Sequence, residues 1–268
     1  MTTTNRLTIL SANLKNPFFQ PGRVDWPAVE ARLAAFARLA EATAADVLLL
    51  QEVGRRGEFR VDNWLSERLG LVGLYERANR AFGAEEGVAI LSRYPLLQPA
   101  VCVLAGGLWR RPALGAVVGS PVDAPVDAPM GEVAVFTVHL SLRPWRNRGQ
   151  PAALRAWVAA TAGERAAVIG GDFNAHETAP HIAALRAEWI DVFRATRPTA
   201  DGTTHTLRPG PWLPRRWALN RRLDYIYLRP GESVLRIADC DHRARADNAD
   251  PPFSDHRAVV ARFVAGGG

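Results

Sequence analysis

Val168-Ile169-Gly170-Gly171-Asp172-Phe173-Asn174 joins an apolar run to a carboxylate and an amide. The run 166–169 predicts a buried strand, which the two glycines end. Asp172 and Asn174 occupy alternate positions, so an extended chain would present both on one side. Polar groups directly after a buried strand are held by a rigid scaffold and face solvent, as catalytic groups often do. Taken alone, this stretch is explained equally well by an ordinary turn after a strand. Whether it is catalytic depends on whether other predicted strands end in residues of the same kind.

Further apolar segments predict strands that carry the same kind of residue at their ends. These segments are 7–12, 46–50, 87–91, 132–140, 223–228 and 258–263. Polar residues able to take part in catalysis stand at or near their ends: Asn13, Glu52, His139, Asp224, Asp255 and His256. Each has a structural explanation of its own, such as a turn residue, a solvated carboxylate or a packed histidine. Asp224 lies within an apolar strand, where a carboxylate is unfavourable unless it has a partner.

The 268 residues suffice for one large domain or two small ones. Helical periodicity predicts helices at 26–45, 61–70 and 152–162, whereas 143–148 is predicted as a basic loop. No clear linker divides the chain, so we expect one domain over residues 1–268 with flexible ends at about 1–5 and 265–268.

No apolar run is long enough to cross a bilayer, and the N-terminus has no signal-peptide pattern. We therefore expect a cytoplasmic protein without stable membrane association. Cys102 and Cys240 have no zinc-like spacing and are expected to be buried free thiols.

The formal net charge is +6, and Lys15 is the only lysine among the 33 basic residues. A basic surface favours a polyanionic partner such as nucleic acid, although an arginine-rich composition also follows from GC-rich coding. The segment 208–222 interleaves arginine with tryptophan, a mixture that can contact phosphates and stack on bases. A surface loop fixed by its tryptophans is the alternative.

The candidate residues favour metal-assisted chemistry. The sequence has no Gly-x-Ser-x-Gly motif and no phosphate-binding glycine-rich loop. Carboxylates, amides and histidines without cysteine suit a hard divalent cation, which can stabilise charge on a phosphate oxygen.

Seven short motifs together resemble the endonuclease/exonuclease/phosphatase superfamily, the metal-dependent phosphoesterases related to DNase I and exonuclease III. The motifs are Asn13, Gln51-Glu52, 87–92, 137–140, 171–174, 222–226 and 254–256. The resemblance runs from about residue 7 to 263. It implies an α/β four-layer sandwich, in which two mixed β-sheets pack face to face and helices flank them.

The resemblance also implies roles for the residues that would hold metal and water. Glu52 would be the main magnesium ligand, with Asn13 and Asp255 supporting the metal or its waters. Asp172 would position and deprotonate the attacking water, and Asn174 would orient that water or the phosphate.

A second group would contact the phosphate. His256 would stabilise the pentacovalent state, with Asp224 holding its imidazole, and this would supply the partner that Asp224 requires. His139 would contact a non-bridging oxygen, and Arg111 resembles a phosphate-contacting arginine of some members. Further substrate-binding candidates come from the arginine- and tryptophan-rich segment: Arg215, Arg216 and Trp217.

These features predict a nuclease that uses Mg²⁺ or Mn²⁺ to hydrolyse DNA or RNA by in-line attack of an activated water, and we expect a monomer. A phosphatase or phosphodiesterase acting on a phosphoinositide, a sphingomyelin-like lipid or another small phosphoester is the alternative. An inactive nucleic-acid-binding module is the third reading, and the intact set of candidate residues argues against it.

Overall fold

The computed structural model describes residues 6–19, 21–105, 107–119, 131–207, 219–232, 235–248 and 250–265. The predicted binding residues Arg215, Arg216 and Trp217 lie outside the described residues. The same is true of the predicted flexible ends, except for Ala265.

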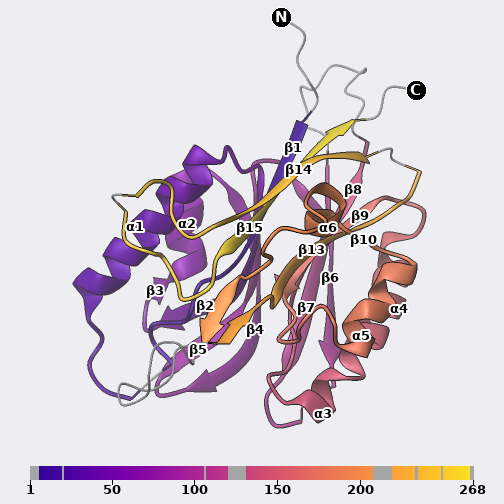
Figure 1. The fold of residues 1–268 in the computed structure, drawn as a ribbon. Helices are drawn as coiled ribbons and strands as arrows, with labels where there is room; N and C mark the ends of the chain where they lie inside the picture. The colour runs from indigo at the N-terminus through magenta and orange to yellow at the C-terminus, as the bar shows by residue number, and fades with distance from the viewer. Residues whose placement is uncertain are drawn as a thin grey trace, which may run out of the picture.

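Strands dominate the chain and helices fall between them (Figure 1). The helices are α1 (Trp26–Ala42), α2 (Val61–Leu69), α3 (Pro144–Asn147), α4 (Gln150–Ala162), α5 (Pro180–Ala183) and α6 (Val192–Thr196), with a 3₁₀ turn at Ala184–Ala187. The strands are β1 (Arg6–Asn13), β2 (Val47–Arg56), β3 (Phe59–Arg60), β4 (Val72–Ala81), β5 (Ala84–Ser92), β6 (Leu96–Leu104), β7 (Arg111–Val118), β8 (Val133–His139), β9 (Ala167–Asp172), β10 (Ile190–Asp191), β11 (His205–Leu207), β12 (Leu219–Arg221), β13 (Asp224–Arg229), β14 (Leu235–Arg243) and β15 (Ala258–Ala265).

The strands form two large sheets and one small hairpin. The seven-stranded sheet has the order β14-β15-β1-β2-β5-β4, with β3 added beside β2. The six-stranded sheet has the order β10-β13-β9-β8-β7-β6, and β11 pairs with β12. One pair in each large sheet is parallel, β1 with β2 and β8 with β9, while the other pairs are antiparallel. Both sheets are therefore mixed, as predicted.

Three apolar layers hold the sheets and helices together. Val47 and Leu49 point into a core shared by the two sheets, where they pack with residues such as Val168. Leu48 and Leu50 point the other way, into a core formed with α1 and α2. This explains why 47–50 is apolar at every position, because each face of the strand is buried.

The third apolar layer lies between the six-stranded sheet and helices α4 and α5, where Ile169 packs with Leu154 and Ile182. In Figure 1, α1 and α2 flank one side of the sheets and α4 and α5 flank the other. The predicted four-layer sandwich is confirmed.

Helix α1 shows how local sequence sets an element. Asp25 caps its N-terminus, where the side chain accepts a hydrogen bond from the amide of Ala28 at 3.2 Å. The helix ends at Ala42, three residues before the predicted end, and the Thr43 hydroxyl bonds back to the carbonyl of Leu39 at 2.8 Å. Ala44 then takes a left-handed conformation that stops the helix. Among the described residues, no helix combines the length and apolarity needed to cross a membrane.

Candidate active site between the two sheets

Three predicted residues form a row across the six-stranded sheet. His139 of β8 is the register partner of Asp172 in β9, and Asp224 of β13 is the partner of Asp172 on the other side. Opposite residues on neighbouring strands project their side chains from the same face. The Nε2 atom of His139 lies 3.7 Å from Oδ2 of Asp172, and both side chains are buried. The register therefore brings together residues that are up to 85 positions apart (224 − 139).

Asp172 receives hydrogen bonds on both carboxylate oxygens. The backbone amide of Asn174 donates to Oδ1 at 2.8 Å, and the Nδ2 atom of Asn13 donates to Oδ2 at 3.1 Å. Burial, together with the charge of Asp224, raises the pKa of Asp172 to about 7 despite these bonds. Asn174 adopts a positive φ of 49°, and its side chain donates to the carbonyl of Leu140 at 3.0 Å. Asn174 thus closes the turn beside the carboxylate.

His256 pairs with Asp224 as the resemblance implied. The Nδ1 atom of the ring lies 2.8 Å from Oδ2 of Asp224. Burial of the ring opposes its charge, but the Asp224 carboxylate outweighs burial and raises the pKa of His256 to about 10. The imidazole is therefore cationic at neutral pH. Its Nε2 forms no hydrogen bond with the residues that the structure describes, and it can act as a donor. The ring of His205 lies against it at 4.4 Å between centroids, a contact that sequence reasoning missed.

Glu52 enters the site from the other sheet. The apolar run predicted a strand end here, but this was wrong, because β2 continues to Arg56 and Glu52 lies at a bulge. Its positive φ of 51° is unusual for glutamate and turns the side chain out of the normal alternation. Its carboxylate accepts hydrogen bonds from Nδ2 of Asn13 at 2.9 Å and from the amide of Asn16 at 3.2 Å. Asn13 therefore bridges Glu52 and Asp172 across the two sheets.

Glu86 of β5 is a functional candidate that sequence reasoning missed. It is buried beside the other carboxylates, and burial and the charge of Glu52 raise its pKa to about 7. Arg111 faces the same group of acids, and its Nε has no hydrogen-bond partner among the described residues. A cleft of about 300 Å³ is lined in part by Glu52, Glu86, Arg111 and His139. A buried guanidinium nitrogen without a partner, on an arginine that lines a cleft, is available to an anionic ligand.

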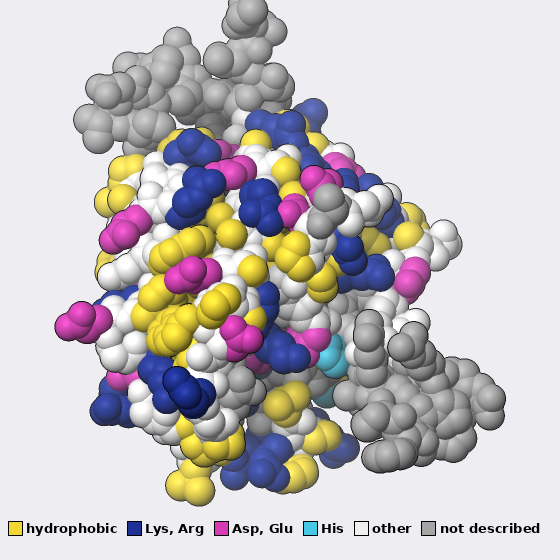
Figure 2. All heavy atoms as spheres, turned by 90° about the vertical axis from the view of Figure 1, so that its left-hand side faces the viewer, with side chains coloured by type: hydrophobic (Ala, Val, Ile, Leu, Met, Phe, Trp, Pro, Cys, Tyr) yellow, Lys and Arg dark blue, Asp and Glu magenta, His cyan; other side chains and the backbone are white. Residues whose placement is uncertain are grey.

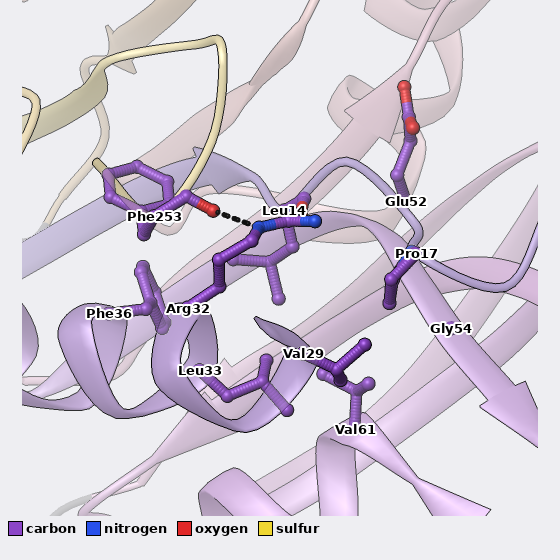
Figure 3. A pocket seen from close by; sticks show the side chains of 10 residues that line it. All are labelled: Leu14, Pro17, Val29, Arg32, Leu33, Phe36, Glu52, Gly54, Val61 and Phe253. Atoms are coloured by element: carbon purple, nitrogen blue, oxygen red, sulfur yellow. Dashed lines mark hydrogen bonds between the residues drawn. The ribbon is translucent and has the colours of Figure 1, made fainter. Parts of the chain in front are cut away.

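Asp255 has a more exposed position than the other site residues. Its carboxylate forms an ion pair with Nζ of Lys15 at 2.7 Å. Arg32 of α1 donates from Nε to the carbonyl of Phe253 at 3.0 Å (Figure 3). Its Nη2 donates to the carbonyl of Leu14 at 2.6 Å. Arg32 thus ties the loop after β1 to the loop that carries Asp255.

The family model for the endonuclease/exonuclease/phosphatase family matches residues 11–256, the span that contains every one of these groups. The chain belongs to the endonuclease/exonuclease/phosphatase family. Members of this family are phosphoesterase hydrolases that depend on divalent metal ions. The resemblance inferred from the sequence motifs is confirmed.

Solved structures of endonuclease/exonuclease/phosphatase proteins share the fold at low sequence identity. One from Beutenbergia cavernae is 21% identical with a TM-score of 0.70, covering 98% of this chain and 72% of that chain. One from Leptotrichia buccalis is 18% identical with a TM-score of 0.72, covering 96% and 99%. D. rerio TDP2, complexed with single strand DNA product, is 17% identical with a TM-score of 0.72, covering 96% and 98%. No curated protein sequence matches the chain.

The acidic residues of this family member suit a divalent cation. Asp172, Asp224 and His256 place possible ligand atoms within 4.8 Å of one another, a set that differs from the predicted ligands Glu52, Asn13 and Asp255. His256 and Asp224 already bond each other, however, and Glu52 stands close enough to Glu86 to raise the pKa of that residue. Crowded carboxylates of this kind are stabilised by a bound cation. The residues present therefore fit a metal ion.

Proposed function

We propose that this chain is a divalent-metal-dependent phosphodiesterase that cleaves DNA or RNA by in-line attack of water. The observation that carries the proposal is the juxtaposition of a buried carboxylate, Asp172, whose pKa is raised to about 7, with the imidazole of His256, whose pKa is raised to about 10. Possible ligand atoms of these two side chains lie within 4.8 Å of each other. A base and a positive charge are the two groups that hydrolysis of a phosphodiester requires of the protein.

Asp172 acts as the general base. Its pKa of about 7 leaves a substantial fraction of the carboxylate free to take a proton from water near neutral pH. The hydrogen bonds from Asn13 and from the amide of Asn174 fix the direction in which the remaining lone pairs point. A water held by this carboxylate would be positioned for attack on a phosphorus atom. We assign Asn174, whose amide already bonds the carboxylate, to orienting that water or the phosphate.

Three residues stabilise the charge on the phosphate. His256 donates from Nε2 to a non-bridging oxygen, since its Nδ1 is occupied by Asp224. His139 stays neutral because burial, Arg111 and His256 hold its pKa well below the usual range, so it acts as a hydrogen-bonding partner. Arg111 supplies guanidinium donors from the wall of the cleft.

Glu52 would hold the divalent cation, Mg²⁺ or Mn²⁺, which stabilises negative charge on a phosphate oxygen when bound. Asn13 is not assigned as a metal ligand, because both ends of its side-chain amide are already hydrogen-bonded. Its Nδ2 donates to the carboxylates of Glu52 and Asp172, and its Oδ1 accepts from the amide of Lys15. We therefore assign Asn13 to holding these carboxylates in place. Asp255 is held by Lys15 at the rim and contributes negative charge beside His256.

Nucleic acid is the substrate that the remaining features favour. The net charge of +6 suits a polyanion, and arginines line the cleft next to Glu52. The structurally similar D. rerio TDP2 is complexed with a single strand DNA product.

A substrate panel tests the proposal. The purified chain is assayed with Mg²⁺ or Mn²⁺ on single- and double-stranded DNA, RNA, bis(p-nitrophenyl) phosphate and phosphoinositide vesicles. We expect cleavage of nucleic acid that disappears when EDTA is added and returns with excess Mg²⁺. Hydrolysis of the phosphoinositide alone would overturn the nuclease assignment in favour of a lipid phosphoesterase.

A further inference from the structure

Trp109 stands between two clefts. It lines the catalytic cleft together with Arg111 and His139, and it also lines a second cleft of about 590 Å³. The second cleft carries the arginines Arg77, Arg80 and Arg110. A ligand that leaves the catalytic cleft past Trp109 therefore enters a surface lined by three arginines.

The loop that carries Trp109 is fixed in place. The amide of Arg110 donates to Oδ1 of Asn79 at 3.0 Å, and the Arg110 guanidinium donates to the carbonyl of Arg77 at 2.8 Å and to Glu76 at 3.0 Å. The indole packs edge to face on Phe19, with 5.7 Å between the ring centroids. Trp109 is nevertheless 42% exposed. The Trp109 side chain is therefore already ordered, and little side-chain entropy would be lost when a ligand packs on it.

The second cleft keeps positive charge available. Arg77 and Arg110 pair with Glu85 and Glu76. Arg80 is exposed and forms no ion pair within the described part of the chain. Figure 2 shows hydrophobic and basic side chains together at the lower end of the molecule, the end where α3 lies in Figure 1.

We propose that Trp109 is a stacking platform for a base, and that the substrate is a single-stranded nucleic acid running from the catalytic cleft across Trp109 to Arg80. This inference rests on the proposed nuclease function and deepens it. A base can cover the face of an indole only when it is not stacked within a duplex, so the geometry selects unpaired nucleotides. The next phosphate along the strand then meets the cation of Arg80.

A membrane surface is the competing partner for an exposed tryptophan beside arginines. Trp109 lies in a wall shared by two arginine-lined clefts, however, and such a position suits a narrow anionic strand that enters both. A nucleic-acid strand alternates phosphates with aromatic faces, which matches the order arginine, tryptophan, arginine along this path.

The test compares Trp109→Ala with Trp26→Ala, which removes an equally exposed (40%) tryptophan of α1 that lines neither cleft. Each variant is assayed on a single-stranded oligonucleotide and on bis(p-nitrophenyl) phosphate. We expect Trp109→Ala to lower the ratio of the two kcat/KM values by about 5- to 150-fold, the range for loss of one base–aromatic stack, through a higher KM for the oligonucleotide. Trp109→Phe should restore most of the ratio, and Trp26→Ala should keep it within about twofold.

Arg80→Ala provides a second arm, with Arg236→Ala on β14 as its control at the opposite edge of the same sheet. We expect only Arg80→Ala to reduce the salt dependence of oligonucleotide binding.

If the parent cleaves oligonucleotides and Trp109→Ala behaves like Trp26→Ala, the stacking inference is wrong while the nuclease function stands. If the parent cleaves no nucleic acid, the proposed function itself fails. Loss of binding to anionic phosphatidylglycerol vesicles in Trp109→Ala, with oligonucleotide kinetics unchanged, would assign the surface to a membrane instead.

Discussion

Asp172 is a buried carboxylate whose charged form is disfavoured by its surroundings, which is the property expected of a base rather than of a structural ion pair. The Asp172→Asn substitution preserves the size of the side chain and removes its ability to take a proton. We expect kcat on bis(p-nitrophenyl) phosphate to fall by about 10²- to 10⁴-fold, the usual contribution of a general base. Kinetics with saturating Mg²⁺ would measure the loss.

The folded state provides the control for that variant. Because burial already opposes the charge of Asp172, we expect the free energy of unfolding of Asp172→Asn, measured in urea, to be equal to or above that of the parent. A kcat within a few-fold of the parent in a folded variant would remove Asp172 from the mechanism.

Individual residues differ in how far the sequence could predict them. Asp224 needed a partner because of its apolar strand, and the motifs indicated His256, which the structure places at 2.8 Å. Glu86 could not be predicted, because Glu85 beside it is chemically identical. Only the pairing of β4 with β5, which contains an irregularity after Arg77, directs Glu85 to an exposed ion pair and Glu86 to the cleft.

At the scale of elements, Gly171 allows β8 and β9 to approach each other at the site. A Cβ atom at this position would meet the backbone carbonyl of Val138, the residue before His139. Since a backbone atom cannot move aside as a side chain can, Gly171→Ala should separate the two strands at the point where His139 pairs with Asp172. We expect destabilisation of about 1–3 kcal/mol by overpacking, together with a loss of activity.

Gly149→Ala supplies the comparison for this substitution, because a Cβ atom there meets nothing within 4 Å. Thermal unfolding and kcat of the two variants would be measured side by side. A Gly171→Ala protein as stable and active as Gly149→Ala would show that close strand approach does not set the geometry of the site.

Strands and helices could be predicted from the sequence where a single hydrophobic pattern extended through the whole element. The run 47–50 predicted a strand buried on both faces, and it packs into two different cores. The same run could not predict that β2 passes through Glu52 to Arg56, because a bulge depends on pairing with β5. The segment 143–148, predicted as a loop, contains the one-turn helix α3, whose Asn147 side chain is held by the carbonyl of Phe173 at 2.8 Å. Such a distant contact leaves no local pattern.

At the scale of the whole molecule, the site exists because the two sheets meet there, with Asn13 and Glu52 from one sheet and His139, Asp172 and Asp224 from the other. Gln51, fully buried, donates from Nε2 to the Thr137 hydroxyl of the other sheet at 2.9 Å. This hydrogen bond lies one residue before Glu52 on one sheet and two residues before His139 on the other. The order of the motifs along the chain indicated the sandwich, but the position of one sheet relative to the other is fixed by contacts of this kind, which no single segment encodes.

The site between the two sheets concentrates negative charge, so that metal binding can be measured as a gain in the stability of the folded state. Burial is the larger cause of the raised pKa values of Glu86 and Asp172, and the charges of Glu52 and Asp224 raise them further. The metal-free folded state therefore carries buried carboxylates in unfavourable pairs. Mg²⁺ at about a hundred times its dissociation constant should stabilise the parent by about 2.7 kcal/mol, which corresponds to a rise in Tm of roughly 5–10 °C. KCl at equal ionic strength controls for screening.

Glu52→Gln should separate stability from function in this arrangement. Removal of one charge relieves the repulsion, so we expect the Tm without metal to rise above that of the parent, while the increment caused by Mg²⁺ and the hydrolytic activity are both lost. Glu67→Gln, at an exposed position of α2, should leave the Tm and the increment as they are in the parent. Scanning fluorimetry would measure the Tm of the parent, Glu52→Gln and Glu67→Gln with and without Mg²⁺. An increment of equal size in Glu52→Gln would mean that the stabilising ion binds elsewhere, and Asp172, Asp224 and His256 would then be the next group to test.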